Sequence, residues 1–152
     1  MSSPQKPPQT ASIGANSAQT EAVLAIDPGS HKCGIAVVRR DGGIPARGVV
    51  STEALIEEIH TYLSRWHPVA LIVGTGTGSK PLLQRIEAAA FGLPIERMDE
   101  SHTSEAARTR FVSENPPSGW QRLLPLSLRT PDRPYDDYVA VILAERYWEK
   151  RD

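Results

Sequence analysis

Residues 22–28, AVLAIDP, form a nearly continuous apolar run that carries one carboxylate, Asp27, close to its end. Short unbroken apolar runs are typical of strands that are buried on both faces of a sheet. Pro28, Gly29 and Ser30 break the run with a turn. The sequence therefore predicts a central strand that delivers Asp27 to the edge of a sheet.

The residues after this strand predict an antiparallel meander followed by a helix. Residues 33–39 and 44–50 are largely apolar and flank the sequence DGG at 41–43, which is a strong hairpin signal. Residues 52–66 then repeat apolar side chains at helical spacing, behind a Ser-Thr pair at 51–52 that supplies the N-cap.

The remainder of the chain alternates strands and helices, which implies right-handed crossovers and parallel pairing. We expect, in order, a strand at 69–74, a helix at 80–91, a strand at 94–99, and helices at 103–111 and 135–149 on either side of a Pro-rich loop. The fold class is then α/β, with a five-stranded mixed sheet of three antiparallel and two parallel strands and with helices on both faces. This is the element order of the ribonuclease H-like fold.

Composition indicates a single domain. The chain has 152 residues, 39% of them hydrophobic, which is enough for one buried core. We expect residues 1–20, rich in Ser, Pro, Gln and Thr, to be a disordered tail and residues 21–152 to form the domain. The tail lacks the apolar core of a secretory signal, and no later segment approaches the length of a membrane span. Cys33 is the only cysteine, which excludes an internal disulfide and favours a reducing, cytoplasmic compartment.

Carboxylates follow the ends of two predicted strands. Asp27 ends the first strand and Glu100 follows the last, and they start about 10 Å apart if one strand lies between them. Gly74, at the end of that intervening strand, leaves the gap open. We expect Asp137, in the first turn of the last helix, to supply a third ligand, and the neighbouring Asp136 is a further candidate metal ligand. Such oxygen clusters suit Mg²⁺ or Mn²⁺ and hold the two cations of many nucleases about 3.5 to 4 Å apart.

Each carboxylate also has a purely structural explanation. Asp27 before Pro-Gly-Ser suits a turn, and Asp136 and Asp137 suit the positive end of a helix dipole. Asp99 and Glu100 suit a solvated pair that caps the next helix. Only the joint placement of these residues at strand ends and a helix start favours a metal site.

The formal net charge of −1 neither indicates nor excludes a nucleic-acid partner, which must be held by a local basic patch or through metal ions. A glycine-rich lead into the helix at 80–91 suits one backbone phosphate, held by helix amides, Ser79 and Lys80. The alternatives are a plain connecting loop and solvated surface side chains. The other candidates for contact with nucleic acid are Arg108, Arg110, Arg129 and Arg133 for a phosphate track, His31 and His102 beside the carboxylates, and Trp120 for base stacking.

Four stretches of the chain resemble motifs of the YqgF (RuvX) family, namely AIDPGSHKCGIAVV, ALIVG, MDESHTSEA and DDYVAVILAERY. This family of pre-16S ribosomal RNA nucleases is related to the Holliday junction resolvase RuvC, and the resemblance covers residues 22–149. It implies that residues 21–152 are a ribonuclease H-like domain with metal-dependent phosphodiester hydrolysis. It implies that Asp27, Glu100 and Asp137 are catalytic, with Asp99 in a supporting role.

The chain also departs from the family pattern. Ser101 stands where the family has an arginine after Asp-Glu, and the loop GTGTGSK at 74–80 is shorter than usual. The substrate is therefore left open between RNA and branched or single-stranded DNA, and the protein between a monomer and a homodimer. A junction resolvase and a catalytically weak ribosome-maturation factor are the alternative functions.

Overall fold

The computed structural model describes residues 20–76, 79–100, 103–114 and 136–151. Its sheet has five strands in the order β3-β2-β1-β4-β5, with bounds β1 Ala22–Asp27, β2 Lys32–Arg39, β3 Ala46–Ser51, β4 Leu71–Gly74 and β5 Ile95–Met98. The helices are α2 Leu55–Trp66, α3 Ser79–Ala88, α4 Thr103–Glu114 and α5 Asp136–Arg151. Within these ranges, no helix is both long and apolar enough to cross a membrane.

Strand pairing confirms the predicted architecture. β1 pairs antiparallel with β2, and β2 pairs antiparallel with β3. β1 pairs parallel with β4, which pairs parallel with β5. β4 therefore separates β1 from β5, as the sequence required if Asp27 and Glu100 were to flank one intervening strand.

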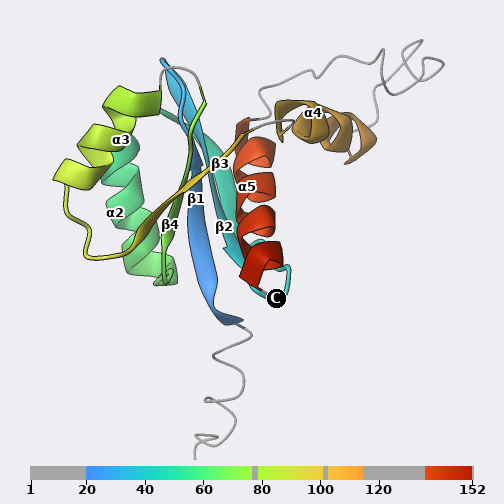
Figure 1. Ribbon diagram of the computed structural model, residues 1–152, viewed down its shortest axis with the longest axis horizontal. Helices are drawn as coiled ribbons and strands as arrows, with labels where there is room; N and C mark the ends of the chain where they lie inside the picture. The colour runs from blue at the N-terminus through green and yellow to red at the C-terminus, as the bar shows by residue number, and fades with distance from the viewer. Residues whose placement is uncertain (1–19, 77–78, 101–102, 115–135, 152) are drawn as a thin grey trace, which may run out of the picture.

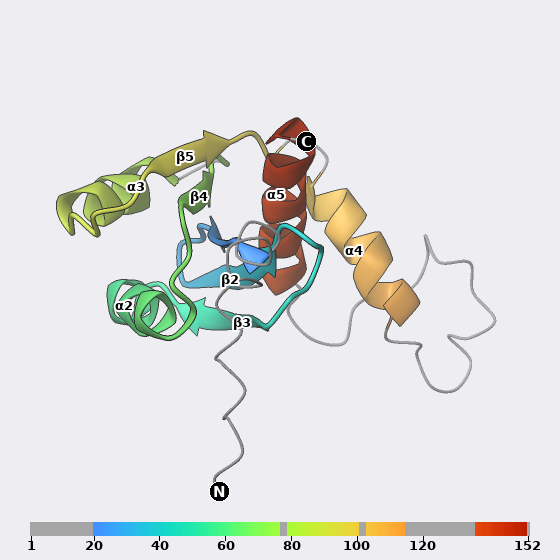
Figure 2. The same ribbon diagram turned by 90° about the horizontal axis from the view of Figure 1, so that it is seen from below.

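Helices cover both faces of the sheet, so that the molecule has three layers (Figure 1 and Figure 2). α2 and α3 lie on one face; α5 lies on the other, and α4 packs against it from outside. The residues of β1 alternate between two cores. Leu24 and Ile26 pack with α2 and α3, whereas Val23 and Ala25 pack with α4 and α5. By the same alternation, Asp27 belongs to the α5 face.

α5 is fixed to the sheet along its length. Tyr138 near its start is buried and makes an edge-to-face contact with Phe111 of α4, with ring centroids 5.3 Å apart. Near its other end, Trp148 is buried and its Nε1–H donates a 3.0 Å hydrogen bond to the Val38 carbonyl of β2. The start of this helix is therefore held close to the sheet, where Asp137 lies.

The expected N-cap of α2 is wrong. The helix begins at Leu55, after Ala54, which makes no side-chain cap hydrogen bond. The Thr52 hydroxyl instead donates a 2.8 Å hydrogen bond to the Gly29 carbonyl, and the Thr52 N–H donates to the His31 carbonyl at 2.9 Å. Thr52 therefore ties down the turn that follows Asp27, because its side chain satisfies that turn rather than the helix.

Other element ends differ by a few residues. α3 ends at Ala88, and Ala90 then adopts a left-handed conformation with φ of 51°. α4 continues to Glu114, three residues beyond the expected end at 111. The predicted tail and most of the Pro-rich loop lie outside the described residues.

An ion-pair cluster joins α4 to α5. Arg110 of α4 contacts the carboxylates of Glu114 at 3.1 Å and of Glu145 on α5 at 2.8 Å. Burial by itself would raise the pKa of Glu114. Hydrogen bonds from Arg110 and Tyr138 and the charge of Arg47 outweigh burial and hold the pKa of this carboxyl below its usual value. Glu114 is therefore stabilised in its ionised form at the end of α4.

Replacement of Glu114 by Gln should reduce the loss of stability in acid. A lowered folded-state pKa contributes stability above the usual value of 4.5, and that stability is lost as the pH falls through the lowered value. Because the Glu114 side chain is 43% exposed, we expect an effect of only about 0.2–1 kcal/mol. Between neutral pH and a pH below the usual glutamate pKa, the melting temperature of the wild type should therefore fall further than that of Glu114→Gln. Equal losses would contradict the assignment.

Candidate active site

Asp27 lies between two glycines at the end of β1. It pairs with Gly34 of β2, and the register Ile26↔Val73 brings Gly74 of β4 next to it on the other side. Both glycines belong to the α5 face, like Asp27 itself, because Ala36 and Ile72 on the same strands pack against α5. No neighbouring strand therefore places a side chain across the space beside the Asp27 carboxylate.

The Glu100 carboxylate fills the space beside Gly74 and Gly76. A Cβ on Gly74 would overlap Oε1 of Glu100, and a Cβ on Gly76 would overlap Oε2. The Glu100 backbone is held by Thr103, whose N–H donates a 2.9 Å hydrogen bond to the Glu100 carbonyl. The sequence analysis expected the gap at Gly74 to stay open; in the structure, the Glu100 carboxylate occupies it.

Asp137 is buried in the first turn of α5, with 3% of its surface exposed. Its Oδ2 lies 3.7 Å from Nε of Arg47, a residue of β3. Nη2 of Arg47 also donates a 3.2 Å hydrogen bond to the Tyr138 hydroxyl. The structural alternative, an interaction with the positive end of the helix dipole, also agrees with this position, because Asp137 lies in the first turn of α5.

Arg47 is the site residue that the sequence analysis missed. In β3, Ala46 and Val50 pack toward α2, so the intervening Arg47 points toward α5. The sequence signal that could have identified Arg47 is a lone arginine at an inward position of an edge strand.

Two buried carboxylate oxygens, Oε1 of Glu100 and Oδ1 of Asp137, have no hydrogen-bond partner among the described residues. Burial of an unsatisfied carboxylate oxygen is costly, and a hard cation satisfies such an atom. No three Asp, Glu, His or Cys side chains within the described ranges are close enough together to form a complete metal site. The donor chemistry of Asp27, Glu100 and Asp137 suits a divalent cation, and Glu100 and Asp137 each have one orphaned oxygen.

Ser79 and Lys80 begin α3, and the Ser79 N–H donates a 3.1 Å hydrogen bond to the carbonyl of Gly76, the glycine that lies against Glu100. With Thr75, Gln84 and Arg97 they line a pocket of about 430 Å³ beside α3. Ser79 is buried and Lys80 exposed, at the start of the helix. This position agrees with the expected helix start, but contact with nucleic acid there stays a prediction.

The other expected site residues divide into two groups. His31 is exposed in the turn after β1, and the Asp99 backbone carbonyl accepts a 3.4 Å hydrogen bond from Arg146 of α5. Arg110 makes the ion pairs with Glu114 and Glu145 described above. The remaining candidates lie outside the described residues, namely Arg129, Arg133, His102, Trp120 and the side chains of Arg108 and Asp136.

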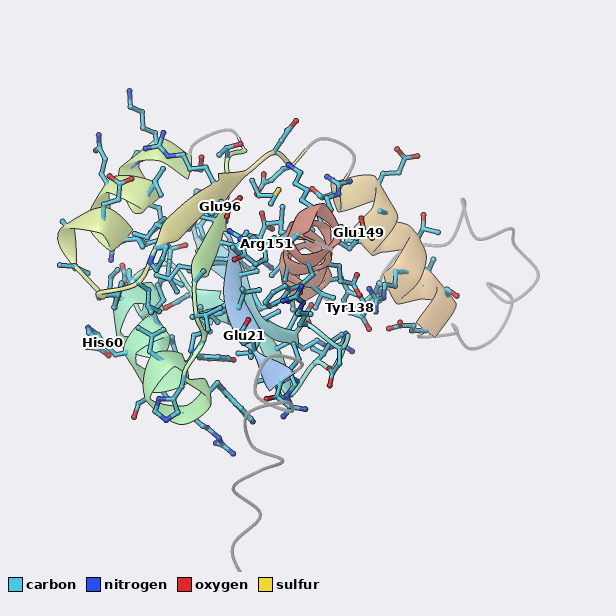
Figure 3. The ribbon with its side chains drawn as sticks, turned by 60° about the horizontal axis from the view of Figure 1, so that its bottom comes forward. Glu21, His60, Glu96, Tyr138, Glu149 and Arg151 are labelled. Carbon is cyan, nitrogen blue, oxygen red and sulfur yellow. The ribbon has the colours of Figure 1, made fainter. Side chains whose placement is uncertain are left out.

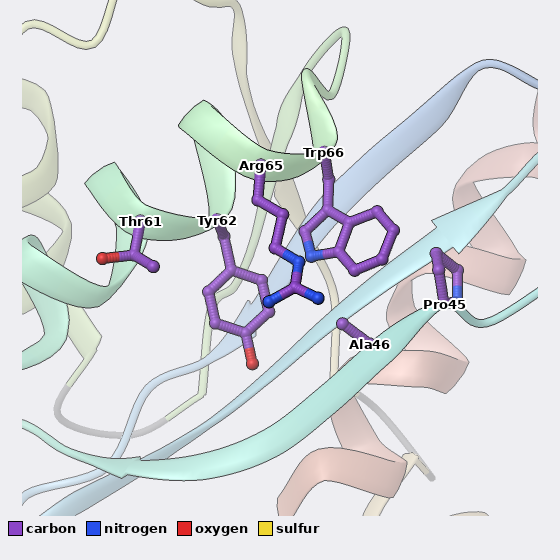
Figure 4. A pocket seen from close by; sticks show the side chains of 6 residues that line it. All are labelled: Pro45, Ala46, Thr61, Tyr62, Arg65 and Trp66. Carbon is purple, nitrogen blue, oxygen red and sulfur yellow. The ribbon is translucent and has the colours of Figure 1, made fainter.

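A second pocket, of about 260 Å³, lies between β3 and α2 and is lined by Pro45, Ala46, Thr61, Tyr62, Arg65 and Trp66 (Figure 4). Burial, assisted by the nearby Glu58 carboxylate, raises the pKa of Tyr62, so its hydroxyl stays protonated. Ala46 and Tyr62 pack with the α2 core, on the face of the sheet opposite Asp137. This pocket is therefore separate from the carboxylates.

Comparison with known proteins assigns the chain to a family. The model of the RuvX family, described as Holliday junction resolvase, matches residues 21–122, a segment that contains Asp27 and Glu100 and ends before Asp137. A candidate pre-16S rRNA nuclease of Cupriavidus necator is 31% identical over 99 residues, which cover 56% of this chain and 70% of that protein. A protein of the same name from Cupriavidus taiwanensis matches equally.

Solved structures support the fold. RuvC of Thermus thermophilus, in complex with a Holliday junction substrate, superposes with a TM-score of 0.54 at 21% identity, over 86% of this chain and 95% of that one. The Fowlpox virus resolvase, in complex with Holliday junction DNA, gives a TM-score of 0.56 at 11% identity over 86% and 98%. The ribonuclease H-like fold is thereby confirmed. The chain belongs to the RuvX family and is, by that membership, a nuclease, a hydrolase of phosphodiester bonds.

Proposed function

We propose that this protein hydrolyses phosphodiester bonds of pre-16S ribosomal RNA in the cytoplasm, with Mg²⁺ or Mn²⁺ held by Asp27, Glu100 and Asp137, and with Asp136 as a further ligand. The observation that carries the proposal is the pair of orphaned buried oxygens, Oε1 of Glu100 and Oδ1 of Asp137. They belong to two of the three carboxylates that the sequence pattern selects.

The three carboxylates differ in how tightly the surrounding residues hold them. When bound, divalent cations supply an activated water and stabilise the leaving oxygen in an in-line displacement. Asp27 is half-buried at the end of β1, between Gly34 and Gly74 of the neighbouring strands. Glu100 is locked against Gly74 and Gly76, and Asp137 is held by Arg47. Two ligands are therefore rigid before substrate arrives, which reduces the reorganisation needed in the transition state.

The choice of ribosomal RNA follows the names of the curated relatives, which are 31% identical to this chain over 99 residues. Cleavage of a four-way DNA junction by a dimer is the second candidate, favoured by the description of the family model and by the two resolvase structures. Both functions use the same carboxylates, so substrate preference separates them.

Asp27→Asn should abolish cleavage and leave the fold intact, because it removes a ligand charge with little change of shape. Wild type and variant should be assayed on precursor 16S rRNA, single-stranded RNA and DNA, and a four-way junction, each with Mg²⁺, Mn²⁺ or EDTA. We expect cleavage only by the wild type and only with metal. Undiminished cleavage by Asp27→Asn would exclude the assignment, and binding without any cleavage would indicate a maturation factor.

Gly74→Ala should reduce cleavage about 100-fold, because the added methyl group displaces the Glu100 carboxylate. The matched control is Gly48→Ala in β3, where a Cβ would meet only the Tyr62 hydroxyl at an ordinary 3.8 Å. Activity and melting temperature should be measured for both variants, since overpacking at Gly74 also costs about 1–3 kcal/mol of stability. Equal activity in the two variants would show that the position of Glu100 does not matter.

A further inference from the structure

We propose that Arg47 is a positioning residue that holds Oδ2 of Asp137 and leaves Oδ1 as the single oxygen available to a metal ion. This inference rests on the proposed function, because it concerns the same carboxylate. It adds a residue of the edge strand β3 to a site otherwise built from β1, the end of β5 and α5.

The contacts of Asp137 divide its two oxygens. Oδ2 lies 3.7 Å from Nε of Arg47, whereas Oδ1 is buried and has no partner among the described residues. The attraction between the Arg47 guanidinium and Oδ2 limits rotation of the Asp137 carboxylate about its Cβ–Cγ bond. A metal ion can then be bound by Oδ1 without breaking the ion pair, and Asp137 is restricted to one-oxygen ligation.

Arg47 is itself held by groups other than the three candidate carboxylates. Its Nη2 donates a 3.2 Å hydrogen bond to the Tyr138 hydroxyl, and its guanidinium carbon lies 4.4 Å from the centroid of the Tyr138 ring. Its charge also acts on Glu114 at the end of α4, where it helps to lower the pKa of that carboxyl. A guanidinium with these partners is fixed in place, so it orients Asp137 rather than following it.

The chain contains a matched control for this arrangement. Arg151, in the last turn of α5, contacts the Glu96 carboxylate at 3.3 Å, and its guanidinium carbon lies 4.4 Å from the Tyr147 ring centroid. Figure 3 shows Arg151 beside Glu96. This arginine has the same two kinds of partner as Arg47 but no contact with a site carboxylate. Replacement of Arg151 therefore shows the general effect of removing an arginine from between a carboxylate and a tyrosine ring, and any further effect of replacing Arg47 is specific to Asp137.

The test is Mn²⁺ binding to the full chain, measured by titration calorimetry and by the electron paramagnetic resonance of free Mn²⁺. Arg47→Ala should weaken Mn²⁺ binding about tenfold, the lower end of the effect of losing a group that orients a metal ligand. Arg47→Lys, which keeps the charge, should recover part of the affinity, and Arg151→Ala should bind as the wild type does. Circular dichroism and melting temperature establish that each variant is folded.

Tyr138→Phe keeps the ring and removes the hydroxyl that accepts from Arg47, so it should weaken Mn²⁺ binding by less than Arg47→Ala. It also keeps the proposal testable if Arg47→Ala fails to fold. Binding as tight as or tighter than wild type in Arg47→Ala would overturn the role of Arg47. If Asp137→Asn weakens binding while Arg47→Ala does not, only this inference fails. If the wild type binds no Mn²⁺, the proposed metal site fails with it.

Discussion

Burial of β1 on both faces is the constraint on which the other elements depend. Residues 23–26 are fully buried, so α2 and α3 must cover one side of the sheet and α5 the other. Side chains alternate along the strand, which makes Asp27 the first polar group on the α5 side, at the edge where the apolar core ends. Glycines flank it on both neighbouring strands, and the Glu100 carboxylate occupies the space at Gly74. The position of the candidate site is thus a direct result of packing in the centre of the sheet.

Most of the fold was predictable because its signals are local. Apolar runs marked β1 and β4, the DGG turn marked the hairpin, and helical periodicity marked α2 and α5. Parallel pairing followed from the alternation of strands and helices, whereas the position of β4 between β1 and β5 was only a condition of the sequence analysis. Element ends were less predictable, because they depend on tertiary contacts. Thr52 has the sequence of a helix cap, but its hydroxyl bonds to a turn 23 residues earlier.

The candidate site was predictable only in part. The placement of Asp27, Glu100 and Asp137 at strand ends and a helix start follows from topology, and the openness at Gly74 follows from its lack of a side chain. The part played by Gly76, and the ion pair between Arg47 and Asp137, depend on the paths of chain segments far apart in sequence. Arg47 and Asp137 are 90 residues apart by their numbers, and no local pattern links them. The one sequence feature that could have indicated this ion pair is an arginine at an inward position of an edge strand.

The last helix both closes the α5 face of the sheet and carries Asp137. Molecules in which α5 has come away from the sheet keep Asp27 and Glu100 but separate Asp137 from Arg47. Under the proposed function, ions that bind only the docked form would stabilise docking by mass action, so metal occupancy and the packing of α5 would strengthen each other. A chain whose final helix is not yet in place would then lack one of its three carboxylate ligands and would be inactive.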